Sequence, residues 1–311
     1  MIEAIHRLME HDTAGDPMTG IRWTRRTTEK IANELAGLGI AICPNTVAKL
    51  LKDLDYRLRV NHKKLSGKKD PCRDEQFGYI SAQRQSFTGR GLPIISIDTK
   101  KRELVGHFKN AGATWSQQPT LVNDHDFRSE AAGIALPYGV YDVAAKHGCL
   151  FVGTSHDTPA FAADNLVRWW NYHGHRRYPL ATELLVLADS GGSNAARTRA
   201  WKHSLQERLC DRHGLTVTVC HYPTSASKWN PIEHQMFSQI SKNWAGRPLD
   251  SYETILNYAR TTRTSTGLHI DAYLVRTDYP TGIKPSDTDM NQLRLRPHHT
   301  QPTRNYTLTP R

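Results

Sequence analysis

Residues 184–192 read LLVLADSGG, five apolar residues followed by a carboxylate, a serine and two glycines. An uninterrupted apolar run of this kind predicts a strand that is covered on both faces, as in the centre of a sheet with helices on either side. Asp189 comes directly after the run, so its side chain is expected where a central strand ends. The stretch therefore predicts an acidic group at the edge of a buried sheet.

Short apolar runs and helical patterns continue on both sides of this strand. The further apolar runs lie at residues 93–97, 139–143, 149–153 and 216–220. Three helical patterns lie among these runs: one begins after Asp157, a second ends at Gly214, and a third begins at Pro231. The resulting order, β-β-β-α-β-α-β-α, predicts an α/β fold in which helices flank a mixed sheet.

Three carboxylates occupy comparable places in this order. Asp98 ends the first strand, Asp189 follows the fourth, and Glu233 lies in the first turn of the last helix. If folding gathers them, their oxygens suit Mg²⁺ or Mn²⁺, and two such ions about 3.5–4 Å apart can hold the reacting oxygens of a phosphoryl displacement. Turn formation and the helix dipole would explain the same residues without chemistry. Spacing also leaves four competing carboxylates: Asp124, Asp126, Asp142 and Asp157.

Positive charge is concentrated ahead of this domain. The 311-residue chain has 41 Lys and Arg against 30 Asp and Glu, a net charge of +11. Residues 22–69 hold twelve of the basic and four of the acidic residues, so this segment alone carries +8 (12 − 4). A basic segment joined to a nearly neutral domain predicts a module that binds a polyanion.

Apolar spacing within the basic segment predicts two short helices, at 28–38 and from Pro44, joined by a turn that contains Gly39. This is the helix-turn-helix pattern, although a helical hairpin with a basic rim would look the same. Alternation at residues 56–60 predicts a strand with a basic face that would form a wing. The predicted DNA-binding residues are Arg25, Arg26, Asn45, Thr46, Lys49, Lys52, Arg57, Arg59, Lys63 and Lys64.

Other classes of protein and site find little support in the sequence. No apolar run approaches the roughly 18 residues of a membrane span. The five cysteines include no C-x-x-C pair, which predicts reduced thiols rather than a disulfide framework. None of the sixteen histidines stands in H-x-x-x-H spacing, so local spacing predicts no zinc site.

The blocks around the three acids resemble those of DDE transposases: residues 97–100 (IDTK), 187–194 (LADSGGSN) and 228–234 (KWNPIEH). More closely, the chain resembles the Rhodopirellula-type DDE transposases of ISAzo-type insertion sequences, which are relatives of the mariner-like superfamily. Further stretches that fit this family lie at 105–112, 122–127, 137–139, 153–157 and 240–244. The resemblance covers about residues 22–311.

The resemblance implies a ribonuclease-H-like catalytic fold with Asp98, Asp189 and Glu233 as catalytic, metal-binding residues. It implies a Mg²⁺- or Mn²⁺-dependent enzyme, with two ions, that cleaves transposon ends with water and joins the freed 3′-hydroxyl to target DNA. The implied partners are double-stranded DNA, both terminal inverted repeats and target, and at least one further copy of the chain on that DNA. The implied location is the bacterial cytoplasm, at the nucleoid.

The predicted organisation has three parts. A helix-turn-helix domain and basic linker occupy residues 1–70, a catalytic domain occupies 71–260 with an insertion at about 104–137, and a C-terminal extension occupies 261–311. Family members carry more sequence ahead of the helix-turn-helix, which predicts a shortened copy here. The alternative function is therefore a truncated, catalytically inactive transposase that acts as a DNA-binding repressor.

Overall fold

The computed structural model describes residues 2–5, 8, 14–15, 22–23, 27–54, 56, 71–114 and 116–311. The chain divides into two compact units, Met1–Leu65 and Ser66–Arg311. None of the helices within the described ranges combines the length and apolar character needed to cross a membrane. The five cysteines are free thiols, as predicted.

The first unit contains the predicted pair of helices, α2 (Thr28–Gly37) and α3 (Pro44–Asp53), with a small hairpin of β1 (Ala14–Gly15) and β2 (Arg22–Trp23). Gly39 has φ of +80°, and this left-handed turn lets the Ile40 N–H reach the Leu35 carbonyl at 2.9 Å. The helices enclose a core in which Ile5, Ile31, Leu35 and Val47 are fully buried. The predicted wing at 56–60 lies outside the described residues except for Tyr56.

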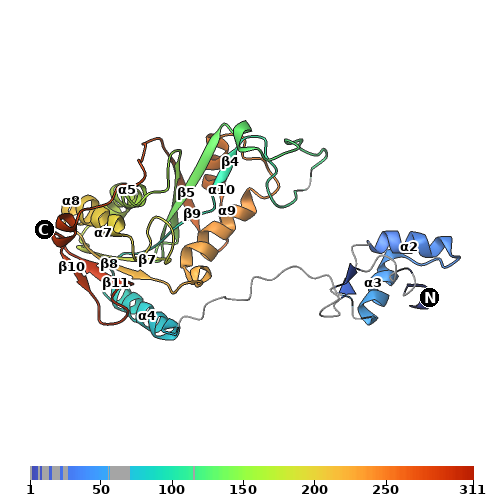
Figure 1. Ribbon diagram of the computed structural model, residues 1–311, viewed down its shortest axis with the longest axis horizontal. Helices are drawn as coiled ribbons and strands as arrows, with labels where there is room; N and C mark the ends of the chain where they lie inside the picture. Colours follow the sequence, from blue (N-terminus) through green and yellow to red (C-terminus); the bar gives the residue numbers. More distant parts are fainter. Residues whose placement is uncertain are drawn as a thin grey trace. The chain divides into compact units, whose positions relative to one another are not determined.

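The second unit is built on a mixed sheet (Figure 1). Its strands run in the order β10-β11-β8-β7-β3-β5-β6-β9, and β4 pairs with β5. β3 is parallel to β7, β7 to β8, and β6 to β9, whereas β5 is antiparallel to β3 and β6. The bounds are β3 (Ile94–Thr99), β4 (Glu103–Val105), β5 (Gly133–Asp142), β6 (His147–Gly153), β7 (Glu183–Ala188), β8 (Thr216–His221), β9 (His269–Val275), β10 (Leu295–Pro297) and β11 (Asn305–Leu308). The central order β6-β5-β3-β7-β8 is the predicted ribonuclease-H-like arrangement.

Helices cover both faces of this sheet. One face packs against α5 (Pro159–Trp169), η2 (Trp170–Gly174), α7 (Arg199–Leu205) and η3 (Gln206–Cys210). The other packs against α4 (Arg73–Gly89), η5 (Glu233–Phe237), α9 (Ser238–Asn243) and α10 (Tyr252–Thr261). The short elements are η1 (Arg128–Glu130), α6 (His175–Arg177), α8 (Asp211–His213), η4 (Ser227–Trp229) and α11 (Asp287–Asn291).

Successive residues of a strand point to opposite faces, and this decides which side carries the acids. Ile97 and Ala188 belong to the core beneath α5 and α7. The residues that follow them, Asp98 and Asp189, are therefore directed to the side of α4 and η5.

Two regions extend beyond what the sequence predicts. β5 begins at Gly133 rather than at residue 139, so the end of the expected insertion at 104–137 is strand. Residues 261–311, expected as an extension, supply β9, β10 and β11 to the main sheet. The C-terminal segment is thus part of the fold that carries the acids.

Candidate active site

Strand register brings Asp98 and Asp189 together. β3 and β7 run parallel, and Ile97 pairs with Ala188 in the last step of their register. Asp98 follows Ile97 and Asp189 follows Ala188, so both aspartates lie at the carboxyl ends of neighbouring central strands. Asp98 is only 8% exposed, which means that a carboxylate predicted at a sheet edge is largely withdrawn from solvent.

A buried hydrogen-bond network fixes the helix that carries Glu233. Ser96 Oγ donates to Asn230 Oδ1 at 2.5 Å and accepts from the Ile232 N–H at 3.0 Å. Asn230 Nδ2 donates to the Ile97 carbonyl at 3.0 Å. The start of the Glu233 helix is therefore bonded to β3 within two residues of Asp98.

A glycine opposite Asp98 lets this helix approach the sheet. Gly139 of β5 pairs with Asp98, and a Cβ at Gly139 would stand 2.6 Å from both Ile232 Cδ1 and Phe237 Cε1. Contacts this short do not occur between carbon atoms, so any larger residue would displace the side chains of Ile232 and Phe237. The close seating of Glu233 beside Asp98 thus depends on the absence of a side chain at residue 139.

The three acids interact electrostatically. Burial, together with the charges of Asp189 and Glu233, raises the pKa of Asp98 to about 9, against a 2.7 Å hydrogen bond from the Thr99 N–H. Burial also raises the pKa of Asp189, although the Gly191 N–H donates to its Oδ1 at 3.1 Å. The charges of Glu233 and Asp157 act on Asp189 in the same direction. Asp98, Asp189 and Glu233 therefore share one site.

The donor set matches a hard divalent cation. All three side chains offer oxygen, and no lysine or arginine of the described residues forms an ion pair with any of them. The lysine that is nearest in sequence to Asp98, Lys100, pairs instead with Glu103 at 2.8 Å. Carboxylates crowded in this way are stabilised as anions by cations of high charge.

The competing carboxylates fall into different places. Asp157 accepts a 3.3 Å hydrogen bond from Thr99 Oγ1 and acts on Asp189, so it is a fourth acid beside the three. Asp142 is fully buried and pairs with Arg177 at 3.2 Å, an arrangement that serves the fold. Asp124 and Asp126 lie in an exposed segment.

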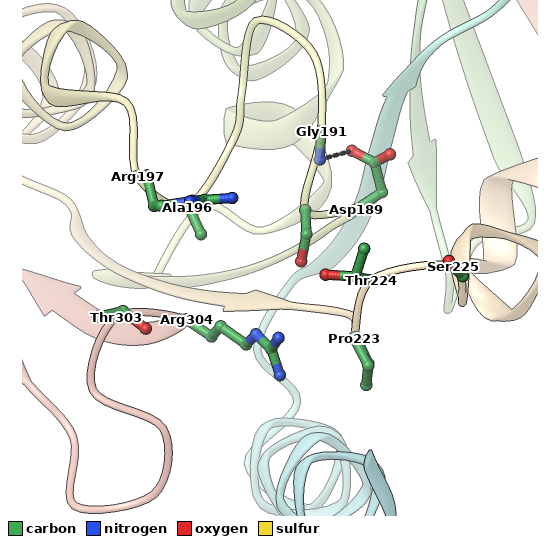
Figure 2. Close-up of a pocket in the computed structure, with 10 residues that line it drawn as sticks. Asp189, Gly191, Ala196, Arg197, Pro223, Thr224, Ser225, Thr303 and Arg304 are labelled. Carbon is green, nitrogen blue, oxygen red and sulfur yellow. Dashed lines mark hydrogen bonds between the residues drawn. The ribbon is translucent and has the colours of Figure 1, made fainter. Parts of the chain in front are cut away.

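A pocket of about 330 Å³ opens next to Asp189 (Figure 2). Two arginines line it from separate segments, Arg197 from the residues before α7 and Arg304 from the residue before β11. Residues that carry hydroxyl groups, among them Thr224 and Ser225, line it as well. Arginine and hydroxyl-bearing residues beside a carboxylate form a surface that is suited to phosphate oxygens.

A buried histidine holds the backbone of Asp189. His221 Nδ1 donates to the Asp189 carbonyl at 2.7 Å, and burial lowers the pKa of His221 to about 4. The imidazole is therefore neutral at physiological pH. The His221 N–H in turn bonds the Arg304 carbonyl at 3.1 Å, so one residue connects the acid and the pocket.

Comparison with known proteins identifies the family. A family model described as "Rhodopirellula transposase DDE domain" matches residues 4–310. The chain belongs to this family. Membership makes the chain a DDE transposase-type protein of the polynucleotidyl transferase and nuclease class, as the sequence blocks indicated. No curated protein sequence matches this chain at a significant level.

Solved structures that resemble this DDE transposase include complexes of the Mos1 transposase. The Mos1 paired-end complex with the left transposon end is 14% identical, with a TM-score of 0.44 over 83% of this chain and 69% of that chain. The Mos1 paired-end complexes with Mn and with Mg are each 13% identical over the same shares, with TM-scores of 0.42 and 0.43.

The residues expected to contact DNA are partly described. Asn45, Lys49 and Lys52 are exposed at successive turns of α3, and Thr46 is half-buried with its Oγ1 3.2 Å from Cys43 Sγ. The remaining six lie outside the described residues: Arg25, Arg26, Arg57, Arg59, Lys63 and Lys64. The sequence did not single out Arg197, because no periodicity or motif marks it. No motif or periodicity marks Arg304 either.

Proposed function

We propose that this DDE transposase family member binds the terminal inverted repeats of its element and cleaves and joins DNA at Asp98, Asp189 and Glu233. The observation that carries the proposal is the convergence of these three acids at the carboxyl end of β3 and β7. Their mutual electrostatic effect, which contributes to the raised pKa of Asp98, is what a pocket for a multiply charged cation requires.

In this proposal Asp98, Asp189 and Glu233 would hold two divalent ions, either Mg²⁺ or Mn²⁺. When bound, the ions supply charge neutralisation at the phosphate and activation of the attacking oxygen. The protein contributes position: β3 and β7 set two carboxylates side by side, and the Ser96–Asn230 network seats the third. No side-chain nucleophile is needed, since positioning and electrostatics supply the catalysis.

The proposal assigns the arginine-lined pocket to the DNA backbone. Arg197 and Arg304 would contact phosphate oxygens on the strand that passes Asp189, with Thr224 and Ser225 as hydroxyl donors. The exposed row of Asn45, Lys49 and Lys52 on α3 would enter a major groove of the terminal repeat. Two or more copies would assemble on the paired ends and the target.

A nicking assay tests the proposal. Labelled duplexes carrying the DNA that flanks the gene on each side are incubated with the protein and Mg²⁺ or Mn²⁺. Asp98→Asn, Asp189→Asn and Glu233→Gln are each expected to abolish nicking while duplex binding persists. Asp124→Asn, in an exposed segment, is the matched control and is expected to cut like the unchanged protein.

Two outcomes would contradict the proposal. Unchanged protein that binds the duplex but never nicks it with either cation would favour a DNA-binding repressor. Nicking that survives all three substitutions would place the chemistry at other residues.

A further inference from the structure

A second cluster of metal-ligating side chains lies where β6 and β9 begin. These strands are parallel, and their register sets His147 beside His269 and Cys149 beside Asp271. Residues two apart share a face of a strand, so these four side chains form a two-by-two patch. His173 of η2 packs over the patch, with its ring centroid 4.7 Å from that of His147.

Three imidazoles converge on one carboxylate in this cluster. Asp271 Oδ2 lies 3.0 Å from His147 Nε2 and 3.6 Å from His173 Nε2. Asp271 Oδ1 lies 3.5 Å from His269 Nε2. A tetrahedral zinc ion with bonds of 2.0–2.1 Å holds neighbouring ligand atoms about 3.3 Å apart. The distances from the three imidazole nitrogens to the Asp271 oxygens, 3.0–3.6 Å, are therefore close to the ligand–ligand distance around such an ion.

The cluster is anchored on one side and accessible on the other. The side chain of His147 is 7% exposed, and that of His269 is 48% exposed. An ion could therefore enter past His269 and meet ligands that the fold already holds. One ligand atom each from His147, His269 and Asp271 lies within 4.8 Å of the others, so the three can reach one ion together.

The surrounding groups are compatible with a bound cation. The neighbouring Arg177 is paired with Asp142 at 3.2 Å, which offsets its charge. His173 Nε2 lies 3.0 Å from the Tyr273 hydroxyl, so this imidazole has a neutral partner beside the site. Cys149 Sγ lies 3.9 Å from His147 Nδ1, and Cys149, His147 and His173 form a neighbouring group of ligand atoms that also lie within 4.8 Å of one another.

This cluster is distinct from the acidic site. Asp98 is opposite Gly139 in β5, whereas His147 is opposite Asp142 at the end of that strand. Cys149, which shares a face with His147, belongs to the core beneath α5, and Asp98 is directed to the other face of the sheet. The two donor sets also differ, since imidazole favours zinc and related metals over Mg²⁺.

We propose that His147, His269 and Asp271 bind one Zn²⁺ that joins β6 to β9, with His173 packed beside the site. β9 is the last strand of the sheet, paired only with β6 among the described strands. A zinc ion there links this edge strand to β6, so its role is structural. The site is independent of the transposition chemistry proposed for the acids.

Zinc binding is tested on the full chain after treatment with a chelator. Asp98→Asn and Asp189→Asn are combined in all samples so that the acidic site does not contribute. Zinc per chain is measured after gel filtration, affinity by competition with a chromophoric chelator, and thermal stability with and without Zn²⁺. We expect one zinc ion per chain, a higher Tm with Zn²⁺, and tetrahedral absorption bands when Co²⁺ replaces it.

His269→Ala removes a half-exposed ligand without disturbing the core. It is expected to weaken zinc binding by more than the roughly 10–100-fold that loss of an outer-shell partner produces. Asp271→Asn is a second variant with the same expectation. The matched control is His125→Ala, because the His125 side chain is 59% exposed and lies outside the cluster. The zinc-free Tm of each variant shows whether it is folded.

The proposal fails if His269→Ala and Asp271→Asn, both folded, retain one zinc ion with unchanged affinity. It also fails if the protein that carries only Asp98→Asn and Asp189→Asn binds no zinc after gel filtration, because the histidine cluster is intact in it. Zinc that raises the Tm of His125→Ala but not that of His269→Ala supports it.

Discussion

Replacing Gly139 with alanine tests whether the seating of Glu233 depends on the bare backbone opposite Asp98. The added Cβ would stand 2.6 Å from Ile232 Cδ1 and 2.6 Å from Phe237 Cε1. Carbon atoms in contact are separated by about 3.5–4.0 Å, so these side chains must move by about 1 Å. Both are buried in the core beneath η5, and the movement is transmitted to the helix that carries Glu233.

Two magnitudes follow from this displacement. Overpacking of a filled core lowers the free energy of unfolding by about 1–3 kcal/mol. Misplacement of a reacting group by about 1 Å lowers the rate by about 100-fold, equivalent to about 2.7 kcal/mol of activation free energy. Gly139→Ala is therefore expected to remain folded under native conditions while its nicking rate falls about a hundredfold.

The two quantities are measured by urea unfolding and by the rate of Mg²⁺-dependent nicking. Gly78→Ala is the matched control, because Gly78 lies in α4 with no atom within 4 Å of an added Cβ. That control is expected to gain about 0.5–1 kcal/mol and to cut normally. Nicking by Gly139→Ala at the rate of the unchanged protein would refute the view that η5 must close tightly on β3.

Two further predictions concern charge at the site. The pKa of Asp98 is raised from 3.8 to about 9. Between these two pH values the folded chain keeps a proton on Asp98 that the unfolded chain has lost. Without metal, the free energy of unfolding should fall as pH rises, by up to about 1.4 kcal/mol per pH unit. Urea unfolding in EDTA from pH 5 to pH 8 measures this slope; Asp98→Asn should flatten it, and a rising profile would contradict the burial of that carboxyl. Arg197→Ala should weaken duplex binding and lower the slope of log K against log[salt] by about 0.9, the share of one phosphate contact. An unchanged slope would remove Arg197 from the DNA interface.

Local patterns predict the central strands and the positions of the acids because each acid marks a boundary. Asp98 and Asp189 end continuous apolar runs, and Pro231 begins the helix that carries Glu233. The topology then brings Asp98 and Asp189 together, because the parallel neighbours β3 and β7 end at the same edge of the sheet. The helix pair of the first unit is predicted for a similar reason, because Gly39 marks the end of the first helix and Pro44 the start of the second. The catalytic and DNA-binding roles stay predictions.

The C-terminal strands escape such patterns because their interior is partly polar. β11 reads NYTL and is buried throughout, with Asn305 and Thr307 inside. Asn305 exchanges hydrogen bonds of 2.7 and 2.8 Å with Gln76 of α4, and Thr307 Oγ1 lies 3.0 Å from Thr218 Oγ1. Polar groups are stable in a core when they are paired, but their partners are remote in sequence. Hydropathy therefore predicts a surface segment where the fold has a strand.

The histidine cluster shows the same limit in a sharper form. Zinc spacings such as H-x-x-x-H detect ligands that one helix presents together, whereas His147 and His269 become neighbours only through the register of β6 and β9. Neither residue ends an apolar run, so neither carries the boundary signal that marks Asp98 and Asp189. A site whose ligands begin parallel strands is thus invisible to spacing and becomes visible once strand order is known. The acidic site was predictable because its residues coincide with element boundaries, not because acids are easier to place than histidines.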